Sequence, residues 1–405
     1  MPSLSLRSQQ IPASPIRKLV PFADAAKKRG THVYHLNIGQ PDLATPPAFW
    51  EAIQAAHPDV IAYTHSAGIM PLRESILQYY AHLGHSLSLP EIMVTTGASE
   101  ALNFVFATCL NPGDEIIIPE PFYANYTAFS VFSNVKVVPI RTRIEDNFAL
   151  PPIEEFEKLI SPRTKAILIC NPGNPTGVLY PKSSLEKLAE IVRRHDLFLI
   201  ADEVYREFAY GGQKHHSILE LKGMEELAIV IDSVSKRFSA CGARIGSIVS
   251  RNTALMAGVL KLGQARLSSP LLAQIGTASL YELPQSYYEE VRHEYEERRN
   301  VLIEELRKIP GVFVPEISGA FYAMVQLPID HSESFCQWML KSFSYEGATV
   351  MTAPGAGFYA SPDMGKDQVR IAYVLQKEDL RKAVRCLAEG LTVYPGKKVL
   401  SKIKN

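Results

Sequence analysis

The stretch Ala228–Arg244 decides the fold, and it reads AIVIDSVSKRFSACGAR. The run AIVID is too short for a helix, is almost wholly apolar and ends at turn-forming serines, which predicts a buried strand. The loop that follows carries the hydroxyls of Ser233 and Ser235 and the ammonium of Lys236, and Arg244 stands eight residues after the lysine. In sheets of parallel strands, binding groups gather on the loops that leave the carboxyl ends of the strands. The stretch therefore predicts an α/β sheet with a cationic site at one edge.

The residue types in this loop suit two kinds of chemistry. Two hydroxyls, an arginine and a helix N-terminus together can hold a phosphate group. A desolvated lysine close to other cations has a lowered pKa, which makes it a nucleophile able to form a Schiff base. The alternative is a solvated turn without a ligand, and both interpretations fit this stretch taken alone.

Six further apolar runs of similar length recur from residue 92 onward. Between several of them lie segments with apolar residues at helical spacing, such as Ser183–His195 (SSLEKLAEIVRRH). This alternation of strands and helices predicts a doubly wound α/β domain with a mainly parallel sheet of about seven strands. The expected strands span residues 92–95, 115–119, 135–140, 166–170, 197–201, 228–232 and 244–250.

Length and charge limit the class of protein. The chain has 405 residues, which predicts two or three domains, and its 42 Lys and Arg residues balance its 42 Asp and Glu residues. A net charge of zero disfavours binding to nucleic acid or to an anionic membrane. The five cysteines lie far apart and no HExxH pattern occurs, so we expect no metal site. Without an apolar leader or a membrane-length apolar run, we expect a cytoplasmic protein.

The pattern of apolar and charged residues divides the chain into three parts. Residues 1–45 hold one helical pattern, Val20–Arg29, and we expect an N-terminal arm that joins the small domain. Residues 46–285 hold the predicted sheet and form the large domain. A long charged helix after Pro284 and a final helix at Lys377–Leu391 indicate a smaller α+β domain, residues 286–405. Within it, GAGFYA matches the GxGxxA fingerprint, but SPD follows where a helix should begin, which disfavours a dinucleotide site.

Three more loops after predicted strands carry polar groups. At residues 95–102 (TTGASEAL) a strand gives way to a helix whose free N–H groups could bind phosphate, although Ser99 or Thr96 could instead cap that helix. Asp202 ends the apolar run LFLIA, and a tyrosine follows three residues later. A carboxylate there can pair with a protonated ring nitrogen, or it can cap a helix. The loop Asn171–Gly177 (NPGNPTG) is rich in turn residues.

The order of these motifs along the chain resembles that of a known enzyme family. The succession TGASEA, PEPFY, NPGNPTG, ADEVY, SVSKRFSACGAR, SGAFYA and VRIAYV is similar to that of the fold type I, class I/II aminotransferases, which use pyridoxal 5′-phosphate (PLP). The resemblance runs from about Asn37 to Val374. It implies the fold of aspartate aminotransferase-like enzymes and a ping-pong transfer of an amino group from an L-amino acid to a 2-oxo acid.

The resemblance also implies a role for each motif residue. Lys236 matches the lysine that forms the Schiff base with PLP and moves the proton, and Asp202 matches the partner of the pyridine nitrogen. Tyr205 and Asn174 match donors to the phenolic oxygen of the cofactor, and Tyr123 matches the aromatic side chain that stacks on its ring. The implied phosphate contacts are Gly97, Ala98, Ser99, Ser233, Ser235, Arg244 and, from the neighbouring subunit, Tyr63.

Substrate contacts follow from the same resemblance. Arg370 in VRIAYV matches the clamp on the substrate α-carboxylate, and Gly39 in NIGQPD belongs to the segment that closes over the site. The classical enzymes hold a distal carboxylate with an arginine of the neighbouring subunit. For that role Arg266 is the nearest match, and Arg17 and Lys18 are alternatives. We therefore expect a homodimer with shared active sites.

The resemblance leaves the substrate open. A dicarboxylic donor, aspartate or glutamate, with 2-oxoglutarate as acceptor is the leading prediction. Many aspartate-specific relatives place tryptophan where this chain has Tyr123, so aromatic, alanine or other neutral donors are an alternative. A PLP-dependent β-lyase would use the same cofactor motifs and is the third interpretation.

Overall fold

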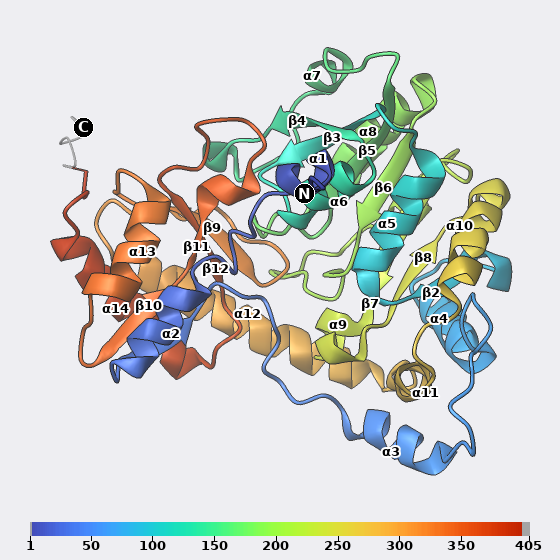
Figure 1. Cartoon of the computed structure of the whole chain (residues 1–405), viewed down its shortest axis with the longest axis horizontal. Helices are drawn as coiled ribbons and strands as arrows, with labels where there is room; N and C mark the ends of the chain where they lie inside the picture. The colour runs from blue at the N-terminus through green and yellow to red at the C-terminus, as the bar shows by residue number, and fades with distance from the viewer. Residues whose placement is uncertain (1, 399–405) are drawn as a thin grey trace.

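A seven-stranded sheet forms the centre of the structure, a computed structural model that describes residues 2–398 (Figure 1). Its strands lie in the order β2-β8-β7-β6-β5-β3-β4, and all neighbours are parallel except at β8, which is antiparallel to both of its partners. The prediction of a mainly parallel α/β sheet of seven strands is confirmed. The strands are β2 (Ile92–Thr95), β3 (Glu115–Glu120), β4 (Lys136–Arg141), β5 (Thr164–Cys170), β6 (Phe198–Asp202), β7 (Ala228–Ser233) and β8 (Gly246–Val249).

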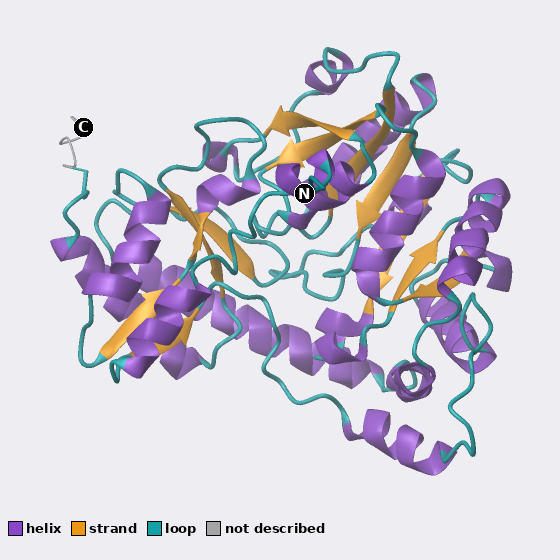
Figure 2. Ribbon diagram, viewed as in Figure 1, coloured by secondary structure: helices purple, strands orange, loops and turns teal. Residues whose placement is uncertain are grey.

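Both faces of this sheet are buried, which explains why its strands are continuous apolar runs. Successive residues of a strand point to opposite faces. In β3, Ile116 and Ile118 pack into one apolar cluster while Ile117 packs into the other. Helices cover both faces, as Figure 2 shows. The helices of this part are α3 (Pro47–Ala56), α4 (Met70–His82), α5 (Gly97–Cys109), α6 (Asn125–Phe132), α7 (Ile153–Glu157), α8 (Lys182–Arg194), α9 (Val234–Arg237), α10 (Thr253–Arg266) and α11 (Leu271–Leu280).

One predicted strand begins two residues later than expected. The run predicted from residue 244 becomes β8 only at Gly246, because Arg244 adopts the left-handed conformation (φ 56°) at the end of a short 3₁₀ turn. Gly246 itself packs against the backbone where α5 begins, and a Cβ atom there would lie 2.6 Å from the carbonyl carbon of Gly97. The turn therefore places the Arg244 side chain beside the start of α5.

A second group of elements surrounds two smaller sheets, at the left of Figure 1. The long helix expected after Pro284 and the final helix expected from Lys377 are both present, and the long helix runs beneath both groups of strands (Figures 1 and 2). The antiparallel sheet contains β11 (Ala353–Pro354), β12 (Gln368–Ala372) and β9 (Tyr322–Gln326), and the parallel pair contains β1 (His32–His35) and β10 (Ala348–Met351). The helices are α2 (Val20–Lys28), α12 (Gln285–Arg307), α13 (Ser332–Ser342) and α14 (Lys377–Val393).

The N-terminal segment connects the two groups of elements. Its strand β1 pairs with β10, whereas its first helix, α1 (Leu6–Gln10), lies against α6 beside the large sheet, where Arg7 donates to the carbonyl of Phe132 at 3.3 Å. The sequence predicted only α2 within this segment. In residues 2–398, no helix has both the length and the apolar character that a membrane crossing needs.

Candidate active site

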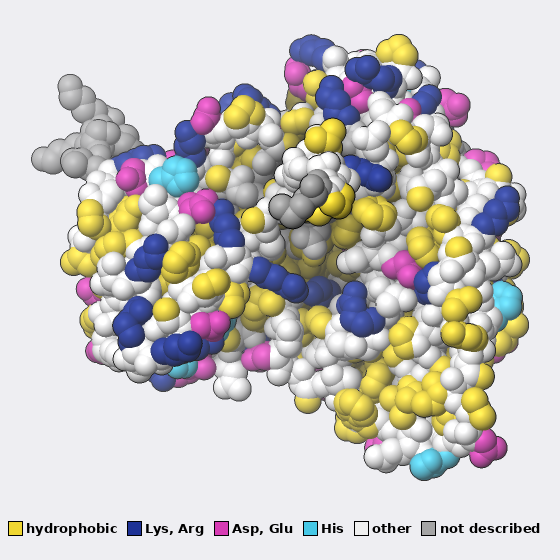
Figure 3. Space-filling view, viewed as in Figure 1, with side chains coloured by type: hydrophobic (Ala, Val, Ile, Leu, Met, Phe, Trp, Pro, Cys, Tyr) yellow, Lys and Arg dark blue, Asp and Glu magenta, His cyan; other side chains and the backbone are white. Residues whose placement is uncertain are grey.

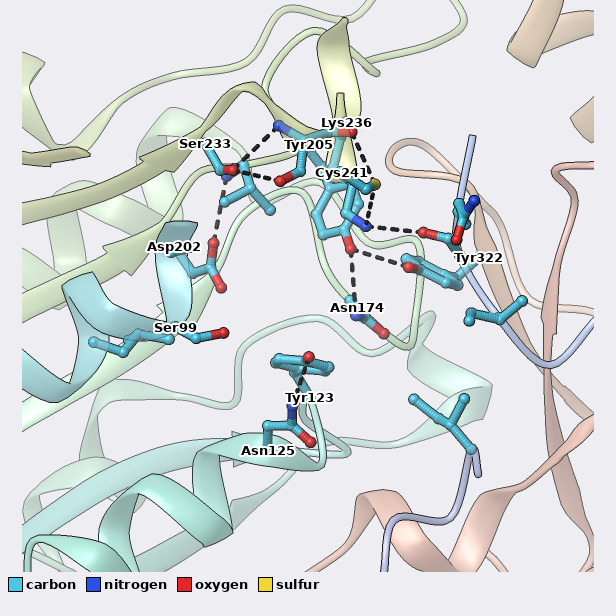
Figure 4. A pocket seen from close by; sticks show the side chains of 18 of the residues that line it. Ser99, Tyr123, Asn125, Asn174, Asp202, Tyr205, Ser233, Lys236, Cys241 and Tyr322 are labelled. Atoms are coloured by element: carbon cyan, nitrogen blue, oxygen red, sulfur yellow. Dashed lines mark hydrogen bonds between the residues drawn. The ribbon is translucent and has the colours of Figure 1, made fainter. Parts of the chain in front are cut away.

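A cavity of about 570 Å³ lies at the carboxyl ends of β6 and β7 (Figure 4). From outside, Lys and Arg side chains lie at the edge of a hollow between the two groups of elements (Figure 3). Thirteen residues that the sequence singled out line this cavity although they come from distant parts of the chain. They are Arg17, Gly39, Ala98, Ser99, Tyr123, Asn174, Asp202, Tyr205, Ser233, Ser235, Lys236, Arg244 and Arg370.

Asp202 forms the acidic end of the cavity. It is the last residue of the central strand β6, and its Oδ2 accepts a hydrogen bond of 2.7 Å from the hydroxyl of Tyr126. Burial raises the pKa of Asp202 to about 6, although the hydrogen bonds from Tyr126 and from the Val204 N–H act in the opposite direction. Residues 204–207 form a turn, so Asp202 caps no helix there. A buried carboxylate without a cationic partner is suited to receive a cation.

Lys236 lies in α9, the single helical turn that directly follows β7. Ser233 caps α9, since its Oγ accepts from the Ser235 N–H at 3.1 Å, and both serines are buried. The Lys236 ammonium donates to the carbonyl of Gly39 at 2.8 Å and lies 3.8 Å from the sulfur of Cys241. The alternative of a solvated turn is therefore not observed. Lys236 forms no ion pair with a carboxylate of the described residues, and it lines the cavity.

An anion-binding corner lies where this turn meets the start of α5. Neither Thr96 nor Ser99 caps the helix, so its first N–H groups stay open, as in any uncapped helix. Arg244 lies beside them and forms no ion pair with any residue from 2 to 398. A Cβ atom at Gly97 would come 2.3 Å from Nη2 of Arg244, so this position requires glycine. A guanidinium beside a positive helix end has room and charge for an anion such as phosphate.

Arg370 forms a second anion-binding corner, on β12. Its buried guanidinium donates from Nη1 to Asn174 Oδ1 at 3.0 Å and from Nη2 to the Asn37 carbonyl at 2.6 Å. Its Nε is buried and has no hydrogen-bond partner among the described residues. The rings of Tyr322 and Phe358 flank the guanidinium, and burial lowers its pKa. A buried arginine that forms no ion pair and has an N–H group without an acceptor is suited to bind a carboxylate ligand.

Three tyrosines complete the cavity wall. The hydroxyl of Tyr205 lies 3.0 Å from that of Tyr322 and accepts from Asn174 Nδ2 at 3.4 Å. On the opposite wall, Asn125 donates to the Tyr123 hydroxyl at 2.8 Å (Figure 4).

Sequence reasoning missed Tyr126, Tyr322 and Cys241 as site residues. Each lies inside or beside a quoted motif, since Tyr322 belongs to SGAFYA and Cys241 to SVSKRFSACGAR. Their role arises from contacts between segments that are distant in the sequence, such as the hydrogen bond of Tyr126 in α6 to Asp202 in β6. Proximity to a motif was the one signal that could have found them.

Four predicted residues do not line the cavity of their own chain, and the first of them, Gly97, lies against the Arg244 guanidinium. Tyr63 lies in the loop between α3 and α4 and is 79% exposed. Lys18 forms an ion pair with Glu333 at 2.6 Å. Arg266 was expected to hold a distal carboxylate, but its Nη1 forms an ion pair with Glu100 at 2.8 Å.

Arg266 has further partners in its own chain. The same Nη1 also donates to the hydroxyls of Thr96 and Ser269, and Nη2 donates to the carbonyl of Ser66. These contacts link α10 to the start of α5, and a substrate carboxylate would have to displace them, which disfavours Arg266 for the distal carboxylate.

Comparison with known proteins gives a consistent result. Residues 31–387 match the family described as Aminotransferase class I and II. The aspartate aminotransferase of Pyrococcus horikoshii is 33% identical over 387 residues, which are 94% of this chain and 95% of that protein. The aromatic-amino-acid aminotransferase 2 of Thermococcus litoralis is 31% identical and covers 94% of this chain and 96% of its own. The solved structure of aspartate aminotransferase from Thermus thermophilus with maleate superposes with a TM-score of 0.88 at 30% identity, covering 96% of this chain and 100% of the other.

Proposed function

Since the chain belongs to the class I and II aminotransferase family, we propose that this enzyme uses PLP to move the amino group of aspartate or glutamate to a 2-oxo acid such as 2-oxoglutarate. The observation that carries the proposal is the meeting of three groups in one cavity: the Lys236 ammonium, the buried Asp202 carboxylate and the unpaired Arg370 guanidinium. They come from α9, from β6 and from β12, so only the folded chain brings them together.

The cavity fits the cofactor in charge and in shape. Arg244, with Ser233, Ser235 and the start of α5, is suited to the phosphate, and Gly97 keeps the space that the arginine needs. Asp202 is suited to a protonated pyridine nitrogen, because its burial leaves the carboxylate in need of a cation. PLP supplies an electron-accepting ring that stabilises the charge left when the substrate Cα loses its proton.

The remaining residues bind and orient the substrate. Arg370 would hold the α-carboxylate with its planar guanidinium, at the cost of its present bond to the Asn37 carbonyl. Lys236 is the one lysine among the described residues that line the cavity, and it would take the proton from Cα and return it. Tyr205 and Asn174 form a hydrogen-bonded pair that could donate to the cofactor oxygen, and Tyr123 offers an aromatic face.

We further propose that the enzyme has two domains and acts as a homodimer. Residues 46–285 would form the large domain, residues 286–405 the small domain, and residues 1–45 the arm that joins it. Tyr63 is exposed and does not line its own cavity, and it would reach the phosphate site of the neighbouring subunit. All five cysteines are unpaired, which supports a cytoplasmic location.

Neutral donors are the second candidate. Ile16, Ile38 and Leu102 give the cavity an apolar part, and a similar protein of Thermococcus litoralis is named for aromatic amino acids. A β-lyase would use the same cofactor contacts and remains a third candidate.

The overall reaction separates these candidates. PLP-loaded enzyme is given ¹⁵N-aspartate and 2-oxoglutarate, and the products are followed by NMR. We expect one ¹⁵N-glutamate for each oxaloacetate formed and no free ammonia. In a second assay a cysteine S-conjugate is the sole substrate, and release of the thiol together with pyruvate and ammonia, without an acceptor, would show a lyase. In a third assay phenylalanine or alanine replaces aspartate, and transfer from these donors alone would show a neutral-donor enzyme.

A further inference from the structure

Four cations and one carboxylate line the cavity in the described part of the chain. The cations are Lys236, Arg244, Arg370 and Arg17, and the carboxylate is Asp202. The proposed function assigns a ligand group to three of the cations, namely the cofactor carbonyl, the phosphate and the substrate α-carboxylate. Arg17 has no assigned anion, and its side chain makes no hydrogen bond or ion pair with any residue between 2 and 398.

The backbone around Arg17 is fixed on both sides. The carbonyl of Ile16 accepts a hydrogen bond of 3.0 Å from Nδ2 of Asn37, and Lys18 is held by Glu333. Leu19, the next residue, is buried. The anchored neighbours therefore present Arg17 at the cavity wall, where its charge acts against the burial that raises the pKa of the Tyr123 phenol to about 12.

The other two cations considered for a distal carboxylate are already engaged. Arg266 pairs with Glu100 and donates to two hydroxyls, and Lys18 pairs with Glu333. Releasing either of them would break an existing ion pair, whereas an anion at Arg17 would break none. Among the described residues that line the cavity, Arg17 is therefore the cation that has neither an assigned anion nor a side-chain partner.

We propose that Arg17 binds the distal carboxylate of dicarboxylic substrates and makes the enzyme prefer diacids over neutral amino acids. The proposal rests on the proposed function and deepens it. A diacid would be held at both ends, by Arg370 on β12 and by Arg17 on the N-terminal segment, with its Cα facing Lys236. Because Arg17 is itself exposed, the pair would be partly solvated and its contribution moderate.

The test compares Arg17→Met with Lys18→Met, a matched change of the neighbouring cation that faces Glu333. Arg17→Lys serves as the conservative variant. In Arg17→Met the ratio of kcat/KM for aspartate to that for alanine should fall about tenfold, and Arg17→Lys should restore part of it. In Lys18→Met the ratio should stay within about twofold of wild type.

A binding measurement provides a readout that does not depend on turnover. Maleate, a diacid without an amino group, and acetate are titrated into PLP-loaded protein while the visible band of the cofactor is followed. The preference for maleate over acetate should fall at least about tenfold in Arg17→Met and hold in Lys18→Met.

The outcomes distinguish this proposal from the proposed function. If wild-type enzyme transfers amino groups but Arg17→Met leaves both ratios unchanged, or if Lys18→Met lowers them equally, the role of Arg17 is overturned while the aminotransferase stands. If wild-type enzyme transfers no amino group from any donor, the proposed function itself fails.

Discussion

Asp202 shows at the scale of one residue how folding prepares a site. Burial raises the pKa of this carboxyl to about 6, above its ordinary value of 3.8. The protonated form therefore stabilises the unliganded fold below about pH 4, and this stabilisation is lost as the pH rises through about 6. At neutral pH the protein carries a buried, unpaired carboxylate, and a cation on the ligand relieves that cost.

The first prediction concerns Asp202→Asn, which keeps the shape of the side chain and removes its charge. It should raise the barrier for amino transfer by about 3 to 5 kcal/mol, because the ring nitrogen would no longer be held protonated. In wild type, PLP affinity should fall as the pH drops through about 6, where Asp202 becomes protonated. Cofactor titrations from about pH 5 to about pH 8 would measure this, and in Asp202→Asn only the dependence due to the phosphate should remain.

Tyr126→Phe is the matched control for this prediction. The Tyr126 hydroxyl lowers the pKa of Asp202, so its removal should move the midpoint of the pH dependence upward. An Asp202→Asn enzyme that keeps the wild-type pH dependence, or that loses less than about tenfold in rate, would show that the carboxylate does not act on the ring nitrogen.

The sequence could predict site residues that stand within a recognisable motif. It could not predict roles that depend on contact with a residue far away in the chain. Lys236 and Arg370 stand in recognisable runs of residues, and both line the cavity. Arg266 stood in an equally suitable run, but Glu100, in the first turn of a different helix, forms an ion pair with it. No local pattern contains that pairing, because the two residues are 166 positions apart.

At the scale of elements, a buried ion pair holds the single helical turn α9, which directly follows β7. The guanidinium of Arg237 donates to Asp232, so a side-chain bridge closes over Ser233 and Lys236 between them. Tyr287 also donates to the Arg237 carbonyl at 3.0 Å. Two nitrogens of Arg237 are buried without a partner among the described residues, so this bridge is costly in stability. Its position suggests that it fixes the turn that carries the lysine.

The second prediction tests this bridge with Arg237→Met. Loss of the pair should lower the free energy of unfolding by about 3 kcal/mol, because Asp232 stays buried, and should speed PLP loss about ten- to hundredfold as the turn loosens. Thermal unfolding and the decay of the visible cofactor band after dilution measure the two effects. Arg298→Met removes another buried, ion-paired arginine, far along α12, and should lower stability without speeding cofactor loss. Equal cofactor loss in both variants would contradict a role of Arg237 in placing Lys236.

The observed strands of the large sheet match the predicted ones closely, because their residues are buried in a regular pattern. The seven strands lie within about two residues of their predicted positions, because a sheet covered on both faces needs continuous apolar runs. The segments 6–10 and 32–35 were not predicted as a helix and a strand. They are short, and β1 exists only because it pairs with β10, which lies more than 300 residues away.

At the scale of the whole molecule, the loop between α3 and α4 presents apolar side chains on the surface. Val60, Ile61 and Tyr63 are 72%, 67% and 79% exposed in this loop. Its backbone is nevertheless anchored, since Gln274 donates to the Thr64 hydroxyl and accepts from the Ile69 N–H. An ordered loop that exposes a cluster of apolar side chains is typical of an interface.

The third prediction follows from the proposed sharing of sites between subunits. Lys236→Ala and Tyr63→Ala, each nearly inactive alone, are mixed, unfolded and refolded with PLP. In a mixed dimer one site collects both lesions and the other has none, so activity should return to roughly a quarter of wild type with random assortment. Lys236→Ala mixed with Arg370→Ala is the control and should stay inactive, because both lesions belong to the same side of the site. Recovery in the control but not in the test mixture would contradict the assignment of these residues to subunits.

The most direct test of the proposed chemistry is the half-reaction in a single mixing experiment. Purified PLP-loaded enzyme is mixed with aspartate alone, without an acceptor, and its visible spectrum is recorded. We predict that the absorbance of the lysine-bound cofactor disappears with one equivalent of oxaloacetate formed per site, that 2-oxoglutarate restores it, and that Lys236→Ala shows neither change. A spectrum that no amino acid alters, or a Lys236→Ala enzyme that completes the cycle at the wild-type rate, would contradict this chemistry.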